Sequence, residues 1–434
     1  MIARVLLLAM VAGPVVADGV PSRFGVDAPE LARLGEFAVG VKTLTLVQAA
    51  QPDVLAFDAA HGTAPARDRM LSVDLWYPAR AARGAAPAVY AASFPSEAPA
   101  PPASFSVPGL AVRGATPAGG GYPLVIVSHG YSGTPAAMTW LTENLASKGY
   151  VVAAIRHQDP PITDRSAFPQ PLLRRALDIA FVARTLQDTL ARQRLIDPTR
   201  TALIGYSAGG YGVLTAAGAT LDPASPAAHM VPGGLLLPFA RGGAMRDSVS
   251  IKGLRAAVAL APMGGGALAA WGSEGIATIK VPLLLIAGDR DRTLDYTSGA
   301  RAFFDQATAV HRYLLTFEGA GHSIGYSPAP DAMRRRLWDQ DWFDGPVWRT
   351  ERVNAINAHF ITAFLDLYVK GDASRAAYLN VAGRESSAGT WPATSTLAYD
   401  AYSPATAEIT VWKGFQRSQS AGLELLQAGS GAAE

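Results

Sequence analysis

The clearest chemical signal in the sequence is a serine flanked by glycines, in the motif Gly205-Tyr206-Ser207-Ala208-Gly209. The motif follows an apolar run that ends at Ile204 and precedes small residues suited to the start of a helix. A G-x-S-x-G motif between a strand and a helix is typical of a nucleophile elbow, the tight turn that exposes a reactive serine. Glycines two residues before and after the serine let neighbouring backbone approach without a Cβ clash. We therefore predict that Ser207 is a nucleophile.

A serine hydroxyl needs a base at neutral pH, and the base needs an acid that orients it. His322 follows the apolar run that ends at Phe317 and a short glycine-containing stretch, as a base on a loop would. Asp291 comes soon after an apolar run that ends at Ile286, and Asp289 and Asp295 compete with it for the role of the acid. The order Ser, Asp, His along the chain is the order found in α/β-hydrolases. We predict a triad of Ser207, Asp291 and His322, although each residue could also be an ordinary loop residue.

Acyl transfer also requires backbone N–H groups that stabilise the oxyanion of the transition state. One candidate is the amide of Ala208, which directly follows the serine at a helix start, where amides are free. The other should come from the loop after residue 128, where we prefer the amide of Tyr131 and keep Gly130 as the alternative. His129 in the same loop is interpreted as a residue that orders the loop rather than as a second base.

The elements that must position these residues alternate between apolar and amphipathic segments, which predicts a mostly parallel sheet flanked by helices. The run at 123–128, for example, is apolar almost throughout, as in a strand buried on both faces. Residues 79–121 are rich in Ala, Pro and Gly, and we predict a loop insertion there. We expect strands at 42–47, 71–77 (ended by Pro78), 123–128, 151–155, 201–204, 255–261, 281–286 and 312–317, and helices at 136–147, 171–193 and 353–369.

Composition limits the class of protein. The chain has 434 residues, 49% hydrophobic and 17% charged, which is enough for a large core and unlike a disordered chain. A net charge of +2 without a dense basic run does not call for a nucleic-acid partner. The absence of cysteine excludes disulfides, a thiol nucleophile, cysteine metal sites and a lipidated cysteine anchor.

The ends of the chain suggest how it is organised. Residues 1–17 are typical of a signal peptide, with Arg4 before an apolar stretch and small residues before Asp18. The stretch is shorter than the roughly 20 residues that span a bilayer, and an uncleaved anchor is the alternative. We expect an exported protein, periplasmic or secreted, with no stable membrane span after cleavage. Residues 18–371 are predicted to form the domain, and residues 372–434 a C-terminal tail that packs on it or extends from it.

Several segments together resemble a known family. Ser128-His129-Gly130-Tyr131, residues 144–159, Gly205–Gly210 and Leu75-Trp76-Tyr77-Pro78 are similar to platelet-activating-factor acetylhydrolases and to bacterial dienelactone-hydrolase-like serine esterases. The similarity covers residues 71–369.

This resemblance implies an α/β-hydrolase fold and an esterase that needs no metal and no organic cofactor. It assigns the triad to Ser207, Asp291 and His322 and the oxyanion hole to Tyr131 and Ala208. The expected partner is a small-molecule or lipid-like ester substrate. True dienelactone hydrolases carry a cysteine nucleophile where this chain has Ser207, which argues against dienelactone cleavage.

Further residues are candidates for the substrate pocket. His157, with Asp159, follows an expected strand and could suggest a metal, but two ligands without a third make a poor site, so we expect a structural or pocket-lining role. Trp338 and Trp342 belong to an aromatic cluster after His322 that either forms an apolar wall for the substrate or simply packs under a loop. Alternative functions are a polyester or lipid hydrolase with an extended substrate, a peptidase, and a non-catalytic binding protein of the same fold.

Overall fold

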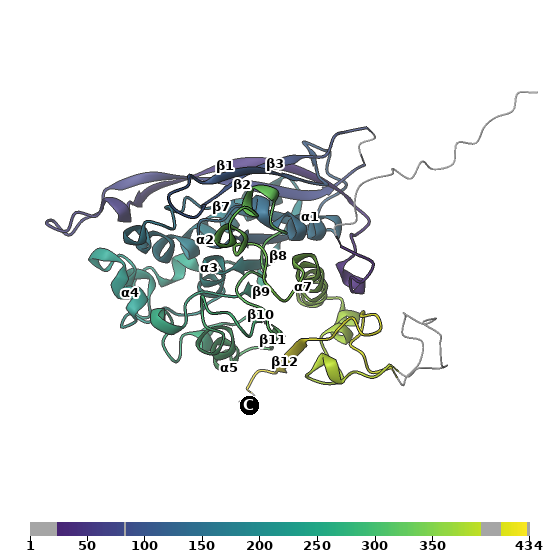
Figure 1. Cartoon of the computed structure of the whole chain (residues 1–434). Coiled ribbons are helices and arrows are strands. Elements are labelled where there is room, and N and C mark those ends of the chain that lie inside the picture. The colour runs from purple at the N-terminus through teal and green to yellow at the C-terminus, as the bar shows by residue number, and fades with distance from the viewer. Residues whose placement is uncertain (1–23, 82–83, 392–408, 432–434) are drawn as a thin grey trace, which may run out of the picture.

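The computed structural model describes residues 24–81, 84–391 and 409–431, so the predicted signal peptide lies outside the described residues (Figure 1). Its centre is a ten-stranded sheet in the order β12-β11-β10-β9-β8-β6-β7-β2-β1-β5. The strands of this sheet are β1 (Ala38–Pro52), β2 (Ala66–Ala79), β5 (Val112–Arg113), β6 (Tyr122–Ser128), β7 (Val151–Arg156), β8 (Ile196–Tyr206), β9 (Leu254–Leu260), β10 (Leu283–Gly288), β11 (Arg312–Phe317) and β12 (Leu423–Ala428).

The six strands from β7 to β11 along the sheet run parallel, whereas β2 pairs antiparallel with β7 and with β1. Parallel strands are buried on both faces, which explains their nearly continuous apolar sequences. In β6, for example, Val125 and Val127 belong to one core, and Leu124 and Ile126 belong to the core on the opposite face.

Helices cover both faces of the sheet (Figure 1). Leu141 of α1 and Phe360 of α7 lie in one core, and Val182 of α2, Val213 of α3 and Phe303 of α5 lie in the other. No helix within the described ranges is long and apolar enough to cross a membrane. The helices are α1 (Thr139–Ser147), α2 (Pro169–Arg192), α3 (Ala208–Ala216), α4 (Pro226–Met230), α5 (Ala302–Gln306), α6 (Leu337–Gln340) and α7 (Thr350–Leu365).

The structure confirms the eight expected strands and the three expected helices, with shifted ends. One boundary was wrong, because Pro78 lies within β2 and pairs with Val39 of β1 instead of ending the strand. The pairing of β2 with β7 stops at Trp76. Pro78 is therefore beyond the part of β2 that must donate amides to β7, and a proline is tolerated there.

The prediction that residues 79–121 form only a loop was also wrong. The segment contains an antiparallel hairpin of β3 (Val89–Phe94) and β4 (Ala103–Pro108), in addition to β5. The residues of β3 alternate strictly between exposed and buried, a period-2 pattern that the small residues Ala91, Ala92 and Ser93 obscure. The Tyr90 hydroxyl accepts a hydrogen bond from Trp76 Nε1 at 2.8 Å and donates to Glu143 Oε1 at 2.6 Å, so the hairpin is fixed to the domain.

The segment after residue 371 contributes a strand that was not expected. β12 pairs antiparallel with β11 from Leu423–Phe317 to Ala428–Arg312, so β11 is not the last strand of the sheet. Leu423 and Leu425 are buried in one core and Leu426 in the other. A partner strand so distant along the chain cannot be inferred from local sequence, which is why this strand was missed.

We predict that Leu425→Ala lowers the free energy of unfolding by about 2–5 kcal/mol, because it removes a buried leucine side chain from the core. The neighbouring Gln427 is exposed, and Gln427→Ala is the matched control, expected to change stability by less than about 0.5 kcal/mol. Urea unfolding followed by circular dichroism measures both. Equal effects of the two substitutions would mean that β12 does not pack as described.

Candidate active site

Ser207 lies in the turn between β8 and α3, at the carboxyl end of the sheet. Its backbone has φ 55° and ψ −117°, a conformation that non-glycine residues rarely adopt and that costs about 1–3 kcal/mol. A Cβ on Gly205 would lie 2.3 Å from Gly209 O, and a Cβ on Gly209 would lie 2.0 Å from Ser128 O. Only glycine fits at these two positions, so the backbone packing of this turn requires the motif seen in the sequence.

The structure brings Ser207, His322 and Asp291 together from three separate loops. His322 Nε2 lies 3.1 Å from Ser207 Oγ, and His322 Nδ1 lies 2.7 Å from Asp291 Oδ2. The histidine side chain is 18% exposed and the aspartate side chain 4%, so the pair opens to solvent on the histidine side. This is the geometry of a nucleophile, a base and an orienting acid.

Asp291 is held as a carboxylate. Its Oδ1 accepts hydrogen bonds from the amides of Thr293 at 2.9 Å and Leu294 at 3.0 Å. Burial raises the pKa of Asp291, but the hydrogen bond and charge of His322 and these two amides outweigh it, so the pKa lies below its ordinary value. Both carboxylate oxygens are thus occupied, and the side chain cannot rotate away from His322 without losing these bonds.

The two competing aspartates have other partners. Asp289 Oδ1 accepts a hydrogen bond from the amide of Gly319 at 2.6 Å. Asp295 Oδ1 accepts from the amide and the hydroxyl of Ser298, both at 2.8 Å. Each carboxylate therefore stabilises loop backbone, whereas the carboxylate of Asp291 is the one that contacts His322.

Tyr206 supports the histidine and was not singled out from the sequence. Its ring stacks on His322 with centroids 5.3 Å apart and an interplanar angle of 27°. Its hydroxyl donates a hydrogen bond to the carbonyl of His322 at 3.0 Å. The signal was present in the motif itself, because the residue before Ser207 has a large aromatic side chain.

The loop expected to provide an oxyanion donor lies against Ser207. A Cβ on Gly130 would lie 3.4 Å from Ser207 Cβ, so the backbone at Gly130 runs beside the serine. Tyr131 directs its ring to Phe168, with centroids 5.7 Å apart. Ala208 is the first residue of α3, where the amide has no partner within the helix.

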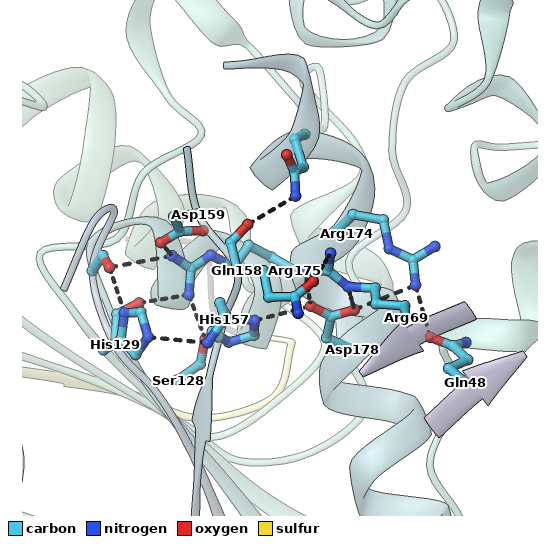
Figure 2. Close-up of polar contacts among 12 residues, drawn as sticks. Gln48, Arg69, Ser128, His129, His157, Gln158, Asp159, Arg174, Arg175 and Asp178 are labelled. Atoms are coloured by element: carbon cyan, nitrogen blue, oxygen red, sulfur yellow. Dashed lines mark hydrogen bonds and ion pairs between the residues drawn. The ribbon is translucent and has the colours of Figure 1, made fainter. Parts of the chain in front are cut away.

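His157 is buried, which agrees with the structural role, the first of the two roles expected from the sequence, and not with a pocket-lining one. Its side chain is only 1% exposed, and its ring contacts Ser128 Oγ at 2.9 Å and Asp178 Oδ2 at 3.0 Å. It belongs to a buried polar network that also includes Arg175 and Asp159 (Figure 2). Among the described residues, no group of three or more His, Cys, Asp or Glu side chains is arranged to hold a metal.

Trp338 and Trp342 lie near the histidine loop. Their rings make an edge contact with centroids 5.5 Å apart, and Ser323, next to His322, donates a hydrogen bond to the carbonyl of Asp341. Trp338 is 37% exposed, in keeping with either a pocket wall or simple packing.

A separate cavity of about 420 Å³ lies against the β3–β4 hairpin, with Phe105, Trp140 and Phe343 in its lining. Its described lining includes none of Ser207, Asp291 and His322, so this cavity is not the space in front of Ser207.

The fold is similar to that of a solved structure. A ferulic acid esterase from Streptomyces cinnamoneus superposes with a TM-score of 0.52 at 22% sequence identity, over 79% of this chain and 94% of that one. The chain has the α/β-hydrolase fold. This confirms the predicted fold class, and Ser207 follows β8, Asp291 follows β10 and His322 comes after β11.

Sequence comparisons support the same α/β-hydrolase superfamily. Residues 105–232, which include Ser207, match a family model described as PET hydrolase-like. Cutinase 2 of Thermobifida cellulosilytica is 28% identical over 204 residues, which span 46% of this chain and 60% of that protein. Cutinase cut1 of Thermobifida fusca is also 28% identical over 204 residues, covering 46% of this chain and 50% of the relative. The chain therefore spans only about half to three-fifths of these relatives.

The prediction that Asp291, and not Asp295, orients His322 can be tested by substitution. We expect Asp291→Asn to slow phosphonylation of Ser207 by a fluorophosphonate probe at least about 100-fold, since acid-to-amide changes in other triads cost up to about 10⁴ in turnover. Asp295→Asn is the matched control and should react like wild type, because the Asp295 carboxylate stabilises its own loop through Ser298. A larger loss in the Asp295 variant would reassign the acid.

The buried histidine network predicts how stability depends on pH. Burial, assisted by the Arg175 guanidinium, lowers the pKa of His157 to about 4. An unfolded chain, with a histidine pKa of about 6.5, binds more protons between these values, so His157 removes up to about 3 kcal/mol of stability as the pH falls from 6.5 to 4. Urea unfolding at several pH values should therefore show a smaller pH dependence for His157→Gln than for wild type.

The exposed His229 provides the control, because His229→Gln changes no buried group. It should keep the pH dependence of wild type. If His157→Gln kept it as well, His157 would be protonated in the folded state, and burial would not lower its pKa.

Proposed function

We propose that this protein is a serine hydrolase that cleaves carboxylic esters through an acyl-enzyme. The observation that carries the proposal is the pair of contacts at His322, 3.1 Å to Ser207 Oγ and 2.7 Å to Asp291 Oδ2. The relatives add support, since their names, cutinase, PET hydrolase-like and ferulic acid esterase, all refer to ester hydrolases.

In the first half of the reaction, Ser207 Oγ attacks the ester carbonyl carbon and His322 Nε2 takes the hydroxyl proton. The carbonyl electron pair moves to oxygen, and the oxyanion accepts hydrogen bonds from the amides of Tyr131 and Ala208. Asp291 keeps Nδ1 of the imidazole protonated and stabilises the imidazolium. The tetrahedral intermediate then collapses, His322 protonates the departing alcohol, and the acyl group stays on Ser207.

The second half repeats these steps with water as the nucleophile. His322 takes a proton from water, the hydroxide attacks the acyl carbon, and the same amides hold the second oxyanion. Collapse returns the proton to Ser207 Oγ and releases the acid. Each residue thus ends in its starting state, and the cycle needs no metal or organic cofactor.

A second candidate within the same chemistry is the hydrolysis of polyesters or lipids. It is favoured by the PET hydrolase-like match and by the partly exposed Trp338, whose ring could contact an extended apolar substrate beyond the ester bond. An exported location, periplasmic or secreted, would suit polymeric or lipid substrates. That location rests on the apolar stretch after Arg4 at the start of the chain.

Ester hydrolysis is tested with the mature protein, a p-nitrophenyl ester series of increasing acyl length, and a polyester film. We expect Ser207→Ala to lower turnover of the best ester at least about a thousandfold, given what triad substitutions cost elsewhere. Ser374→Ala is a matched control, because its hydroxyl donates to Asp372 at an exposed position.

Preference for long acyl chains, or release of acid from the film, would select the polyester or lipid hydrolase. Turnover of short esters alone would select a small-molecule esterase. If wild type and the Ser207 variant were equally slow on every ester, the proposal would fail, and a peptidase or a non-catalytic binding protein would replace it.

A further inference from the structure

A cluster of buried charged side chains lies beside the nucleophile, and none of its members takes part in the acyl-transfer steps. Arg175, on α2, is at its centre, with a side chain only 1% exposed (Figure 2). Burying a guanidinium is expensive unless the charge is paired and its donors are engaged. The cost indicates that this residue does more than fill space.

The guanidinium of Arg175 binds the backbone of the loop that follows β6. Nη1 donates to the carbonyl of His129 at 3.0 Å, and Nη2 donates to the carbonyl of Gly130 at 3.2 Å. Nη2 also forms a short ion pair with Asp159. The fork of donors thus fixes the direction of two successive carbonyls.

Peptide planarity links these carbonyls to the amides that follow them. In a trans peptide, the carbonyl of one residue and the N–H of the next point in opposite directions. When Arg175 draws the carbonyls of His129 and Gly130 toward α2, the N–H groups of Gly130 and Tyr131 must face the other way. Ser207 lies close to this backbone, since a Cβ on Gly130 would be 3.4 Å from Ser207 Cβ.

We propose that Arg175 is a positioning residue for the oxyanion hole, which it sets by holding the carbonyls of His129 and Gly130 so that the next amides face the reacting carbonyl. The inference rests on the proposed function and deepens it. Arg175 touches neither substrate nor reacting atoms, and it acts through the loop backbone.

The surrounding contacts keep Arg175 in place. Ser128 Oγ accepts from Arg175 Nη1 at 3.4 Å and can donate to His157 Nε2 at 2.9 Å. His157 Nδ1 in turn donates to Asp178 Oδ2 at 3.0 Å. Ser128 and His157 each accept one hydrogen bond and donate another in this series, as a neutral His157 allows.

Asp159 secures both the arginine and the far end of the loop. Besides its ion pair with Arg175, its Oδ2 accepts from the amide of Ser132 at 2.9 Å. Ser132 has φ 55°, an unfavourable backbone for a serine that this bond helps to hold. The amide of Gly133 then donates to the carbonyl of Gly130 at 3.1 Å and closes the turn.

The neighbouring Arg174 provides a matched control. It is on the same helix and nearly as buried, with a side chain 3% exposed, but it donates to Gln51, Gln48 and Asp178, away from the loop. Arg175→Lys and Arg174→Lys both keep the charge and remove a guanidinium fork. Only the first removes the fork that binds the two carbonyls.

The test measures kcat and KM on p-nitrophenyl acetate per active site, counted with a fluorophosphonate, and the Ki of phenylboronic acid. The boronic acid forms a tetrahedral adduct with Ser207 and therefore reports on the oxyanion hole without requiring turnover. We expect Arg175→Lys to lower kcat and raise Ki about 10- to 100-fold with little change in KM, since losing one oxyanion donor costs about 10²–10³ in kcat. Arg174→Lys should reduce only thermal stability.

The outcomes separate this inference from the proposed function. If wild type hydrolyses the ester and Arg175→Lys matches Arg174→Lys in kcat and Ki, the inference is overturned and the esterase stands. If wild type neither turns over the ester nor binds the boronic acid, both are overturned. Tighter boronic acid binding to wild type than to Arg175→Lys, without ester turnover, would support the inference alone.

Should Arg175→Lys fail to fold, Asp159→Asn replaces it, because it keeps the side-chain shape and weakens the anchor of Arg175. We expect this variant to lower kcat and boronic acid affinity about 3- to 10-fold. The effect is smaller than that of losing one oxyanion donor, because the loop keeps its other contacts. Wild-type values for a folded Asp159→Asn would overturn the inference.

Discussion

The end of β6, the turn that follows β8 and the residues that follow β9 meet beside Ser207, with no room for side chains between their backbones. Gly205 and Gly209 allow this approach, and Ser207 between them takes a positive φ that its own side chain disfavours. The amide of Ser207 donates to Leu260 O at 2.9 Å, and its carbonyl accepts from the amide of Met263 at 3.0 Å, so β9 and the residues after it hold the strained turn. The position of Ser207 relative to β6 and β9 is therefore fixed by main-chain contacts, and His322 and Gly130 lie next to it.

The polar network next to this turn shows a second way of fixing loops. Burial raises the pKa of Asp178, but Arg69 and His157 outweigh this and keep the pKa below its usual range. Arg69 makes two bonds to the carboxylate, through Nε at 2.9 Å and Nη2 at 2.8 Å. A buried network of this kind adds little net stability over an apolar core, yet removing one member leaves an uncompensated charge. What the network does is hold the backbone carbonyls bonded to Arg175 in fixed orientations.

The sequence predicted those features whose signals are local. Long apolar runs identified the parallel strands, and the glycine-serine motif, with Asp291 and His322 each following such a run, located the three residues that the structure brings together. The β3–β4 hairpin was not predicted because Ala and Ser make up half of its strand residues, and β12 was not predicted because its partner strand is distant in the chain. Arg175 and Asp178 could have been noticed as charges on the apolar face of the helix, but their partners come from three other segments.

The loops that carry Asp291 and His322 contact each other in a way that the spacing of residues along the chain could not predict. The amide of Arg290 donates to Ala320 O at 2.9 Å, and the carboxylate of Asp289 accepts from the amide of Gly319 at 2.6 Å. These cross-links join the loop after β10 to the loop after β11, so the distance between Asp291 and His322 is set by the two loops as well as by the two side chains. Tyr206 then fixes the imidazole from the serine side. His322 is therefore held from two sides, by the loop that carries Asp291 and by Tyr206 next to Ser207.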